Sequence, residues 1–169
     1  DGSMPLLAPM STIAGQLAFV VGSYHLLKHN KGKGVMIGHM DDMDPRVVTV
    51  IGAGVAGTQS ILKAIDNKAL VKVVDSSQSK LDDLKSKYGT ENVEYILSSK
   101  DSIQVSVNES DLVIGSVYVV GKEAPKVVTK DMLSSMNPGT VMVDVSIDQG
   151  GCFETSKPTT HDSPTFLEN

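Results

Sequence analysis

The chain has 169 residues, a mass of 17.9 kDa and a formal net charge of −5, which suits a single domain with one core. Its fifteen basic residues are scattered among twenty acidic ones, which argues against a nucleic-acid-binding surface, and no apolar run approaches the roughly 18 residues that span a bilayer. The single cysteine, Cys152, excludes an intramolecular disulfide framework, and no His or Cys spacing is typical of a zinc site, so we expect no metal and a reducing, cytoplasmic setting.

The N-terminal part of the chain predicts a long helix followed by a linker. Residues 1–4 resemble a remnant of a cloning vector, so we expect the native part to begin near residue 5 and to come from a longer chain. Apolar residues at three- and four-residue spacing over residues 11–29 predict a helix that buries one face: Ile13, Ala14, Leu17, Val20, Val21, Tyr24 and Leu27. Gly15 and Gly22 on this helix predict close packing on a neighbour. Residues 5–45 are thus expected to be an inter-domain helix and linker.

From Arg46 onward, short apolar runs alternate with helical patterns. Runs that are apolar throughout predict strands covered on both faces, and alternation with helices predicts that they are parallel: residues 47–51, 70–74, 93–97, 112–117 and 141–145. The helices between them are expected over residues 55–65, around Leu84 with Ser76 or Ser77 as the cap, over 101–107 and over 129–136. The predicted fold class is α/β, a doubly wound parallel sheet over residues 46–169. No sixth strand follows, so we expect this domain to be clipped at its C-terminal end.

The first strand is followed at once by a glycine fingerprint, Gly52-Ala53-Gly54-Val55-Ala56-Gly57, which opens the next helix. In this position Gly52 permits a sharp turn, Gly54 lets a pyrophosphate approach the main chain, and Gly57 lets the helix pack on the strand. Free N–H groups at the helix start would face the phosphates. A glycine-rich turn without a ligand is the alternative, but the place between strand and helix favours dinucleotide binding.

Asp75 ends the second strand eighteen residues after Gly57, close to the roughly 20 expected for the acid that accepts hydrogen bonds from the adenosine ribose. A carboxylate there would repel the extra phosphate of NADP, and the next residues, Ser76-Ser77-Gln78-Ser79, include no arginine to receive it. The sequence therefore favours NAD. Alternatively Asp75 caps the following helix, and both roles can coexist.

Several further motifs resemble the alanine dehydrogenase and proton-translocating transhydrogenase family, and the resemblance covers nearly all of residues 5–166. They lie at residues 6–11, 50–58, 111–115, 124–126 and 143–154. The last, Val143-Asp144-Val145-Ser146-Ile147-Asp148-Gln149-Gly150-Gly151-Cys152-Phe153-Glu154, favours the alanine dehydrogenase branch, because transhydrogenases typically have an alanine-rich segment ending in Gly-Gly-Asn there. The resemblance implies a Rossmann-type NAD-binding domain of an enzyme that converts L-alanine, NAD and water to pyruvate, ammonia and NADH. It also implies a homo-oligomer, a hexamer.

The resemblance assigns roles to five further residues, each with a simpler alternative. Ser11 matches a serine that reaches the cofactor diphosphate, but a hydroxyl at a helix start can equally be a cap. Lys80 and Ser98 match positions near the adenosine end, where solvated surface is the plain interpretation. Val117 matches an apolar residue beside the nicotinamide, or it simply ends a buried strand. Asp148 matches an aspartate near the nicotinamide ribose and the reacting substrate, and is our candidate catalytic residue; an ordinary loop aspartate is its alternative.

Other reactive residues are expected to be structural. Cys152 has no neighbour in sequence that would lower its pKa, so we interpret it as a small packing residue, and a lone His161 as structural or exposed. The family has a proline where this chain has Val120. Its proton-transferring histidine and its carboxylate-binding lysine belong to a substrate domain that is absent here, so this chain alone is expected to bind the dinucleotide without deaminating alanine. A transhydrogenase component and a non-catalytic NAD-binding module remain the alternatives.

Overall fold

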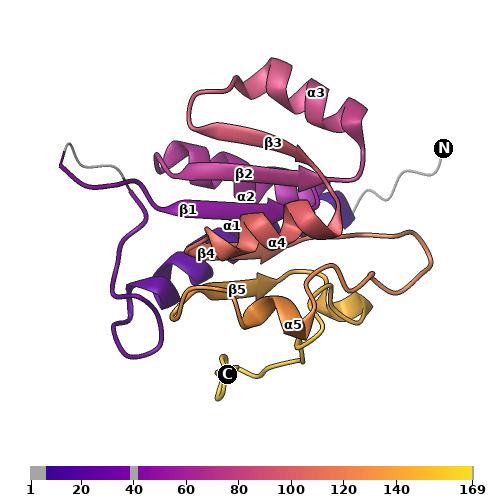
Figure 1. Cartoon of the computed structure of the whole chain (residues 1–169). Coiled ribbons are helices and arrows are strands. Elements are labelled where there is room, and N and C mark those ends of the chain that lie inside the picture. The colour runs from indigo at the N-terminus through magenta and orange to yellow at the C-terminus, as the bar shows by residue number, and fades with distance from the viewer. Residues whose placement is uncertain (1–6, 39–41, 169) are drawn as a thin grey trace.

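A five-stranded parallel sheet forms the centre of the protein. The computed structural model describes residues 7–38 and 42–168 (Figure 1). The strands are β1 Val47–Ile51, β2 Leu70–Asp75, β3 Val93–Leu97, β4 Leu112–Gly115 and β5 Val141–Asp144, and their order is β3-β2-β1-β4-β5. Each strand lies within two residues of its predicted bounds, and the doubly wound α/β fold is confirmed.

Helices cover both faces of this sheet: α1 Leu7–Leu27, α2 Val55–Asp66, α3 Gln78–Tyr88, α4 Lys100–Asn108 and α5 Lys130–Leu133, with the short 3₁₀ helix η1 Ile147–Gln149 after β5. In Figure 1, α1 and α2 lie behind the sheet, and α4 and α5 lie in front of it. Two separate clusters of buried residues correspond to these layers. One joins α1, α2 and α3 to the sheet around Val50 and Val73, and the other joins α4 and α5 to it around Val113. Burial on both sides explains why the strands are apolar throughout.

Local hydrogen bonds define where the helices begin. Ser77, one of the two predicted caps, is the N-cap of α3, and its hydroxyl accepts a bond from the Lys80 N–H at 3.4 Å. Ser99 and Ser102 form a capping box at α4. The predicted cap of α5, Thr129, stands at the N-cap position, but its hydroxyl makes no capping bond. That helix ends at Leu133, three residues earlier than predicted.

The face of α1 that was predicted to be buried is the exposed one. Gly15, Ala18, Phe19, Gly22 and Leu26 are buried instead, and α1 packs on α2, β4 and β5. Six of the seven predicted core residues are exposed: Ile13, Leu17, Val20, Val21, Tyr24 and Leu27, at 46–59%. The prediction was wrong because α1 is apolar all around, so spacing alone could not distinguish its two sides.

Glycine decides which side of α1 packs, as the predicted close packing at Gly15 and Gly22 required. A Cβ on Gly15 would overlap the backbone carbonyl of Ala56, and one on Gly22 would overlap the Leu112 side chain. The Ser60 hydroxyl donates a hydrogen bond to the Gly15 carbonyl at 2.6 Å. The helix also begins at Leu7, four residues before the predicted start, with Pro9 in its first turn, where proline is tolerated.

The segment after α1 is anchored to the domain at two points. Ile37 is buried in the core beside α1, and the Lys33 ammonium lies 2.7 Å from the Asp111 carboxylate. The predicted vector remnant, residues 1–4, and part of the predicted linker, residues 39–41, lie outside the described residues. Among the described helices, none is both long and apolar enough to cross a membrane.

Candidate dinucleotide site

The predicted site residues meet at the carboxyl edge of the sheet. The chain leaves β1 towards α2 on one face, whereas the crossover to the neighbouring strand β4 runs through α4 on the other face. The strand order therefore reverses between β1 and β4, which is where doubly wound sheets bind their ligands. Because all five strands are parallel, their carboxyl ends lie at one edge. Each of them is followed by, or ends in, a predicted residue: the fingerprint after β1, Asp75 at β2, Ser98 after β3, Val117 after β4 and Asp148 after β5.

The three fingerprint glycines differ in what a side chain at each position would meet. Gly52 has a φ of +95°, and a Cβ there would overlap the Ser116 carbonyl oxygen. A Cβ on Gly57 would overlap the Gly52 carbonyl oxygen, so a side chain would push α2 away from β1. Gly54 is different, because a Cβ there would meet no atom within 4 Å. The protein itself therefore does not require glycine at position 54, whereas a ligand close to the main chain would.

The start of α2 fits a pyrophosphate. Its N-cap residue is Gly54, which has no side chain to accept hydrogen bonds from the first-turn N–H groups, and Val55 is 51% exposed. Uncapped amides at the positive end of a helix, facing open space, are the arrangement that binds phosphate. Ser11 lies one helical turn before Gly15, on the α1 face that meets Ala56 near the start of α2. Because α1 begins at Leu7, the alternative that Ser11 caps it is wrong.

Asp75 links the fingerprint loop to α3. Its carboxylate is 7% exposed and accepts hydrogen bonds from the N–H groups of Ala53 at 2.8 Å and Ser77 at 2.9 Å. The Lys80 ammonium lies 3.3 Å from Oδ2. The N-cap residue of α3 is Ser77 and not Asp75. Asp75 therefore does not cap the helix itself, as the alternative to the ribose role supposed, but its carboxylate holds the residue that does. A carboxylate has about four acceptor positions, which leaves one for a ribose hydroxyl, and more if Lys80 moves.

The two positions predicted near the adenosine end both lie next to Asp75. The Ser98 N–H donates a hydrogen bond to the Asp75 backbone carbonyl at 2.9 Å. The Lys80 side chain is 45% exposed and forms an ion pair with Asp75. It is therefore not simply a solvated surface residue. The structure thus gathers Asp75, Lys80 and Ser98 at the ends of β2 and β3, beside the fingerprint.

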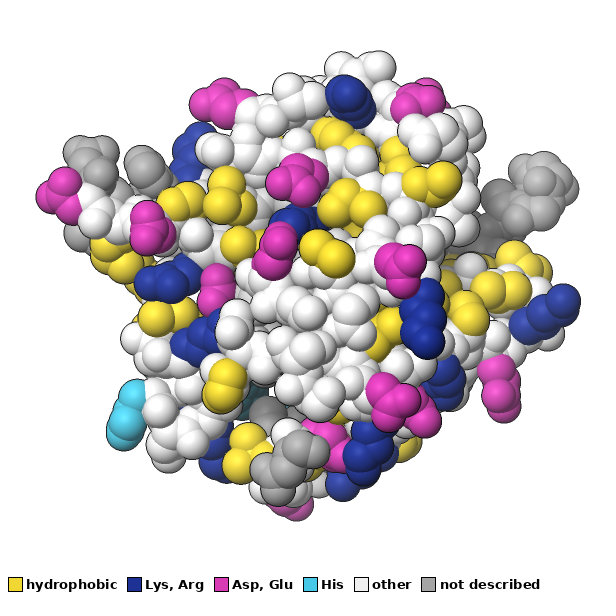
Figure 2. Space-filling model, viewed as in Figure 1, with side chains coloured by type: hydrophobic (Ala, Val, Ile, Leu, Met, Phe, Trp, Pro, Cys, Tyr) yellow, Lys and Arg dark blue, Asp and Glu magenta, His cyan; other side chains and the backbone are white. Residues whose placement is uncertain are grey.

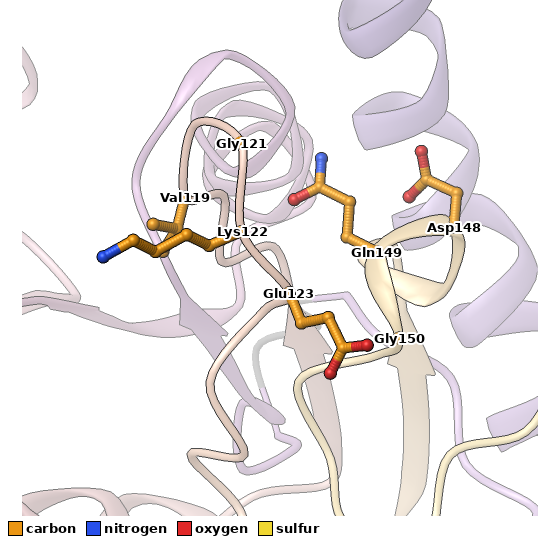
Figure 3. A pocket seen from close by; sticks show the side chains of 7 residues that line it. All are labelled: Val119, Gly121, Lys122, Glu123, Asp148, Gln149 and Gly150. Carbon is orange, nitrogen blue, oxygen red and sulfur yellow. The ribbon is translucent and has the colours of Figure 1, made fainter.

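Asp148 lies at the other end of this edge, beside a cavity. Val117 is half-buried, and its carbonyl accepts a hydrogen bond from the Ser146 hydroxyl at 2.8 Å, which joins the loops after β4 and β5. Asp148 is exposed in η1 and lines a cavity of about 420 Å³ with Val119, Gly121, Lys122, Glu123, Gln149 and Gly150. In Figure 3 the Lys122 side chain extends away from Asp148 and Gln149. The Gln149 Oε1 atom is buried and has no hydrogen-bond partner among the described residues, which leaves an acceptor free for a ligand.

Sequence reasoning missed two residues that hold the loop of Asp148. The Asp144 carboxylate accepts hydrogen bonds from the N–H groups of Ser146, Cys152 and Phe153 and from the Ser156 hydroxyl. The Lys126 ammonium donates to the carbonyls of Gly150 and Gly151. A carboxylate at the end of an apolar strand was the one signal that could have pointed to Asp144.

Cys152 is buried beneath β4, as its interpretation as a packing residue requires. Its side chain is fully buried, and a Cβ on Gly115 would overlap its sulfur. Burial, and next the negative charge of Asp144, raises the pKa of the Cys152 thiol from its usual 9.0 to about 12. The thiol therefore stays protonated, and no nucleophilic role follows from it.

We predict that the native chain resists iodoacetamide at mildly alkaline pH, whereas the urea-unfolded chain is alkylated readily. The raised pKa of Cys152 also makes the free energy of unfolding depend on pH, because the thiol of the unfolded chain ionises near pH 9.0 and the buried thiol only near 12. The contribution of the buried, protonated thiol to stability is therefore fully present below pH 9 and is lost as the pH rises towards 12. Mass spectrometry of both states measures the effect, and a Cys152→Ser variant gives the background. Equal alkylation rates in the two states would contradict the buried position.

Comparisons with known proteins agree with this geometry. The family described as "Alanine dehydrogenase/PNT, C-terminal domain" matches residues 18–169. A protein of Halomonas elongata named alanine dehydrogenase is 47% identical over 167 residues, which are 99% of this chain and 45% of that protein. A solved structure of an L-alanine dehydrogenase superposes with a TM-score of 0.93 and 39% identity, covering 98% of this chain and 46% of its own.

A more distant structure is the transhydrogenase from Sinorhizobium meliloti, with a TM-score of 0.76 and 25% identity over 89% of this chain and 44% of its own. The chain thus spans less than half the length of the relatives it matches. Along this chain, however, the matches cover 99%, 98% and 89% of its residues.

Proposed function

Since the chain belongs to the alanine dehydrogenase/PNT C-terminal domain family, we propose that it is the NAD-binding domain of an alanine dehydrogenase. The whole protein would oxidatively deaminate L-alanine to pyruvate and ammonia. NAD is the cofactor of this domain. The observation that carries the proposal is the uncapped start of α2 at Gly54, which opens onto free space directly beside the buried Asp75 carboxylate.

Each part of the carboxyl edge would have its own task. The backbone N–H groups of the fingerprint, from Gly52 to Gly57, and the Ser11 hydroxyl would bind the diphosphate. Asp75, Lys80 and Ser98 would hold the adenosine ribose, and Val117 would pack beside the nicotinamide. The bound nicotinamide supplies the hydride acceptor.

Asp148 would contribute to the reaction itself. Its exposed carboxylate lines the cavity. There it would orient the amine of the substrate or the attacking water. Asp144 and Lys126 would act through it, because they fix the loop that carries it. In the whole protein, the remaining proton-transfer and carboxylate-binding groups would come from a substrate domain. We propose that residues 5–45 connect to that domain and that residues 46–169 form the dinucleotide domain.

Two other functions are less well supported. A transhydrogenase domain would fit the same fold, but the alanine dehydrogenase structure superposes more closely and at higher identity, 39% against 25%. A non-catalytic NAD-binding module would keep the cofactor site and would be excluded by alanine turnover in the full-length protein. We further propose that the whole enzyme is cytoplasmic and works as a homo-oligomer, for which the family resemblance implies a hexamer.

Calorimetric titration with NADH and NADPH tests the cofactor assignment. We expect the chain to prefer NADH, because the 2′-phosphate of NADPH would approach the Asp75 carboxylate. Asp75→Ala should weaken NADH binding by about 1–3 kcal/mol, since it removes a buried acceptor. It should weaken NADPH binding less, because it also releases the Lys80 ammonium to meet the phosphate.

The matched control is Asp83→Ala, an exposed carboxylate on the same helix as Lys80, which removes the same charge and should leave both affinities unchanged. Equal affinities for NADH and NADPH in the unchanged protein would contradict the ribose role of Asp75. Absence of binding to either would overturn the proposed function.

A further inference from the structure

The side-chain oxygen of Gln149 is a buried acceptor at the carboxyl edge of the sheet. In residues 7–38 and 42–168, three buried side-chain atoms have no hydrogen-bond partner: His25 Nδ1, Arg46 Nε and Gln149 Oε1. His25 lies in the last turn of α1 and Arg46 directly precedes β1, whereas Gln149 lies in η1 after β5. Because an unpaired buried acceptor is costly, its place at this edge calls for a donor from a ligand.

The backbone of Gln149 is fixed by the loops after β4 and β5. Its N–H donates a hydrogen bond to the Ser146 carbonyl at 2.9 Å, and its carbonyl accepts one from the Ala124 N–H at 2.9 Å. The side chain thus starts from a fixed point, while no group of the described structure holds its Oε1 atom. The last torsion of a glutamine side chain is soft, so a small rotation presents this oxygen to a ligand at little cost.

The Gln149 side chain lines the cavity of about 420 Å³ beside Asp148. In Figure 3 its amide stands between the Asp148 side chain and the loop of Val119 and Gly121. A volume of this size is typical of small-molecule sites. Gly121 and Gly150 also line it, and without side chains they let a flat group approach the backbone.

The charges at this cavity disfavour an anion. Asp148 and Glu123 both line it, and Lys122 extends away from Asp148 and Gln149 (Figure 3). The outer surface differs, because on the face in Figure 2 charges of both signs are scattered among hydrophobic side chains. In the cavity a carboxylate or phosphate would meet like charges. An ammonium group would pair with the two carboxylates and would not need the neutral amide of Gln149.

The group that complements Gln149 is another neutral amide. A primary amide offers an acceptor oxygen and donor N–H groups side by side, so two such amides can join through a pair of hydrogen bonds. The dinucleotide carries one primary amide, the carboxamide of its nicotinamide ring. With the diphosphate at the start of α2 and the adenosine beside Asp75, the nicotinamide half would extend towards β4 and β5, where Gln149 lies.

We propose that the side-chain amide of Gln149 pairs with the nicotinamide carboxamide. Oε1 accepts a hydrogen bond from the carboxamide N–H, and Nε2 donates one to the carboxamide oxygen. This pair fixes the rotation of the ring about its bond to the ribose, and so decides which face of the ring is turned to the substrate. The inference rests on the proposed function, because it requires a bound dinucleotide.

Calorimetric titration with three ligands tests the pair. They are NADH, its reduced 3-acetylpyridine analogue, in which a methyl group replaces the amide nitrogen, and ADP-ribose, which lacks the ring. We expect the unchanged protein to bind NADH about 5- to 10-fold more tightly than the analogue, because the analogue cannot donate to Oε1. Equal affinities would overturn the proposal and indicate that Gln149 pairs with a group from outside this domain.

Two substitutions of similar length separate the amide from the rest of the side chain. Gln149→Met removes both hydrogen-bonding atoms and should abolish the preference for NADH over the analogue. Gln149→Glu keeps an acceptor and should keep the preference. The matched control is Gln78→Met, an exposed glutamine on α3, which should also keep it. A preference that survives in Gln149→Met, or is lost in Gln149→Glu, would overturn the proposal.

ADP-ribose separates this inference from the proposed function. Its affinity should be the same in the unchanged protein and in both Gln149 variants, which also shows that they fold. If ADP-ribose binds but the protein does not distinguish NADH from the analogue, only the amide pair fails. If neither ADP-ribose nor NADH binds to the unchanged protein, the proposed function fails as well.

Discussion

Gly54→Ala is expected to weaken NADH binding by about 10- to 100-fold without lowering the unfolding temperature of the protein. The added methyl meets no protein atom within 4 Å, and the φ of −76° at this position suits alanine, so the fold has no reason to change. The same methyl occupies the space in front of the α2 amides, where a pyrophosphate would approach. Calorimetric titration and thermal unfolding measure the two effects separately.

Gly57→Ala is the informative comparison, because the same methyl group is added one turn away in the same fingerprint. There the Cβ would overlap the Gly52 carbonyl oxygen, which forces α2 away from β1. We expect this variant to lose about 1–3 kcal/mol of stability, and NADH affinity as well. If Gly54→Ala bound NADH normally, no phosphate would lie against this turn and the proposed cofactor site would be wrong.

Asp144→Ala is expected to destabilise the protein by about 3 kcal/mol and to loosen the segment from residue 145 to 156. The substitution leaves the backbone N–H groups of Ser146, Cys152 and Phe153 without their acceptor. Urea unfolding measures the loss of stability. In native conditions the Cys152 thiol should become open to alkylation, because the loop that covers it is no longer held.

Asp162→Ala serves as the control for this change. Asp162 is an exposed carboxylate in the C-terminal segment and should leave stability and Cys152 alkylation unchanged. Unchanged stability in Asp144→Ala would mean that water replaces the hydrogen bonds of the Asp144 carboxylate at no cost. In that case the assignment of Asp144 as the residue that fixes the Asp148 loop would fail.

The strands were predictable because both faces of the sheet are covered. Each strand is therefore a short run of apolar residues, and such a run is visible directly in the sequence. The gathering of Asp75, Ser98 and Asp148 at one edge was predictable for a related reason: parallel strands place their carboxyl ends together. Their distances to one another were not predictable. The pairing of Lys80 with Asp75 depends on a side-chain direction at the start of α3 that no spacing encodes.

Two other features could not be predicted from the sequence, because they depend on contacts between residues far apart in the chain. The buried side of α1 could not be predicted from hydrophobic spacing, because both sides of that helix are apolar. The close contacts at Gly15 and Gly22 decide between the two sides. Lys126 reaches the Gly150 and Gly151 carbonyls across 24 and 25 residues of chain. Bonds of that kind appear only once the strands have been placed.

The backbone contact between Gly15 and Ala56 has a mechanical meaning. At this point the two helices touch main chain to main chain, and the Ser60 hydroxyl is hydrogen-bonded across the contact. A contact packed this tightly resists deformation, so we expect α1 and the start of α2 to move together as one rigid unit. A hinge for any motion of this domain is then expected outside these two helices.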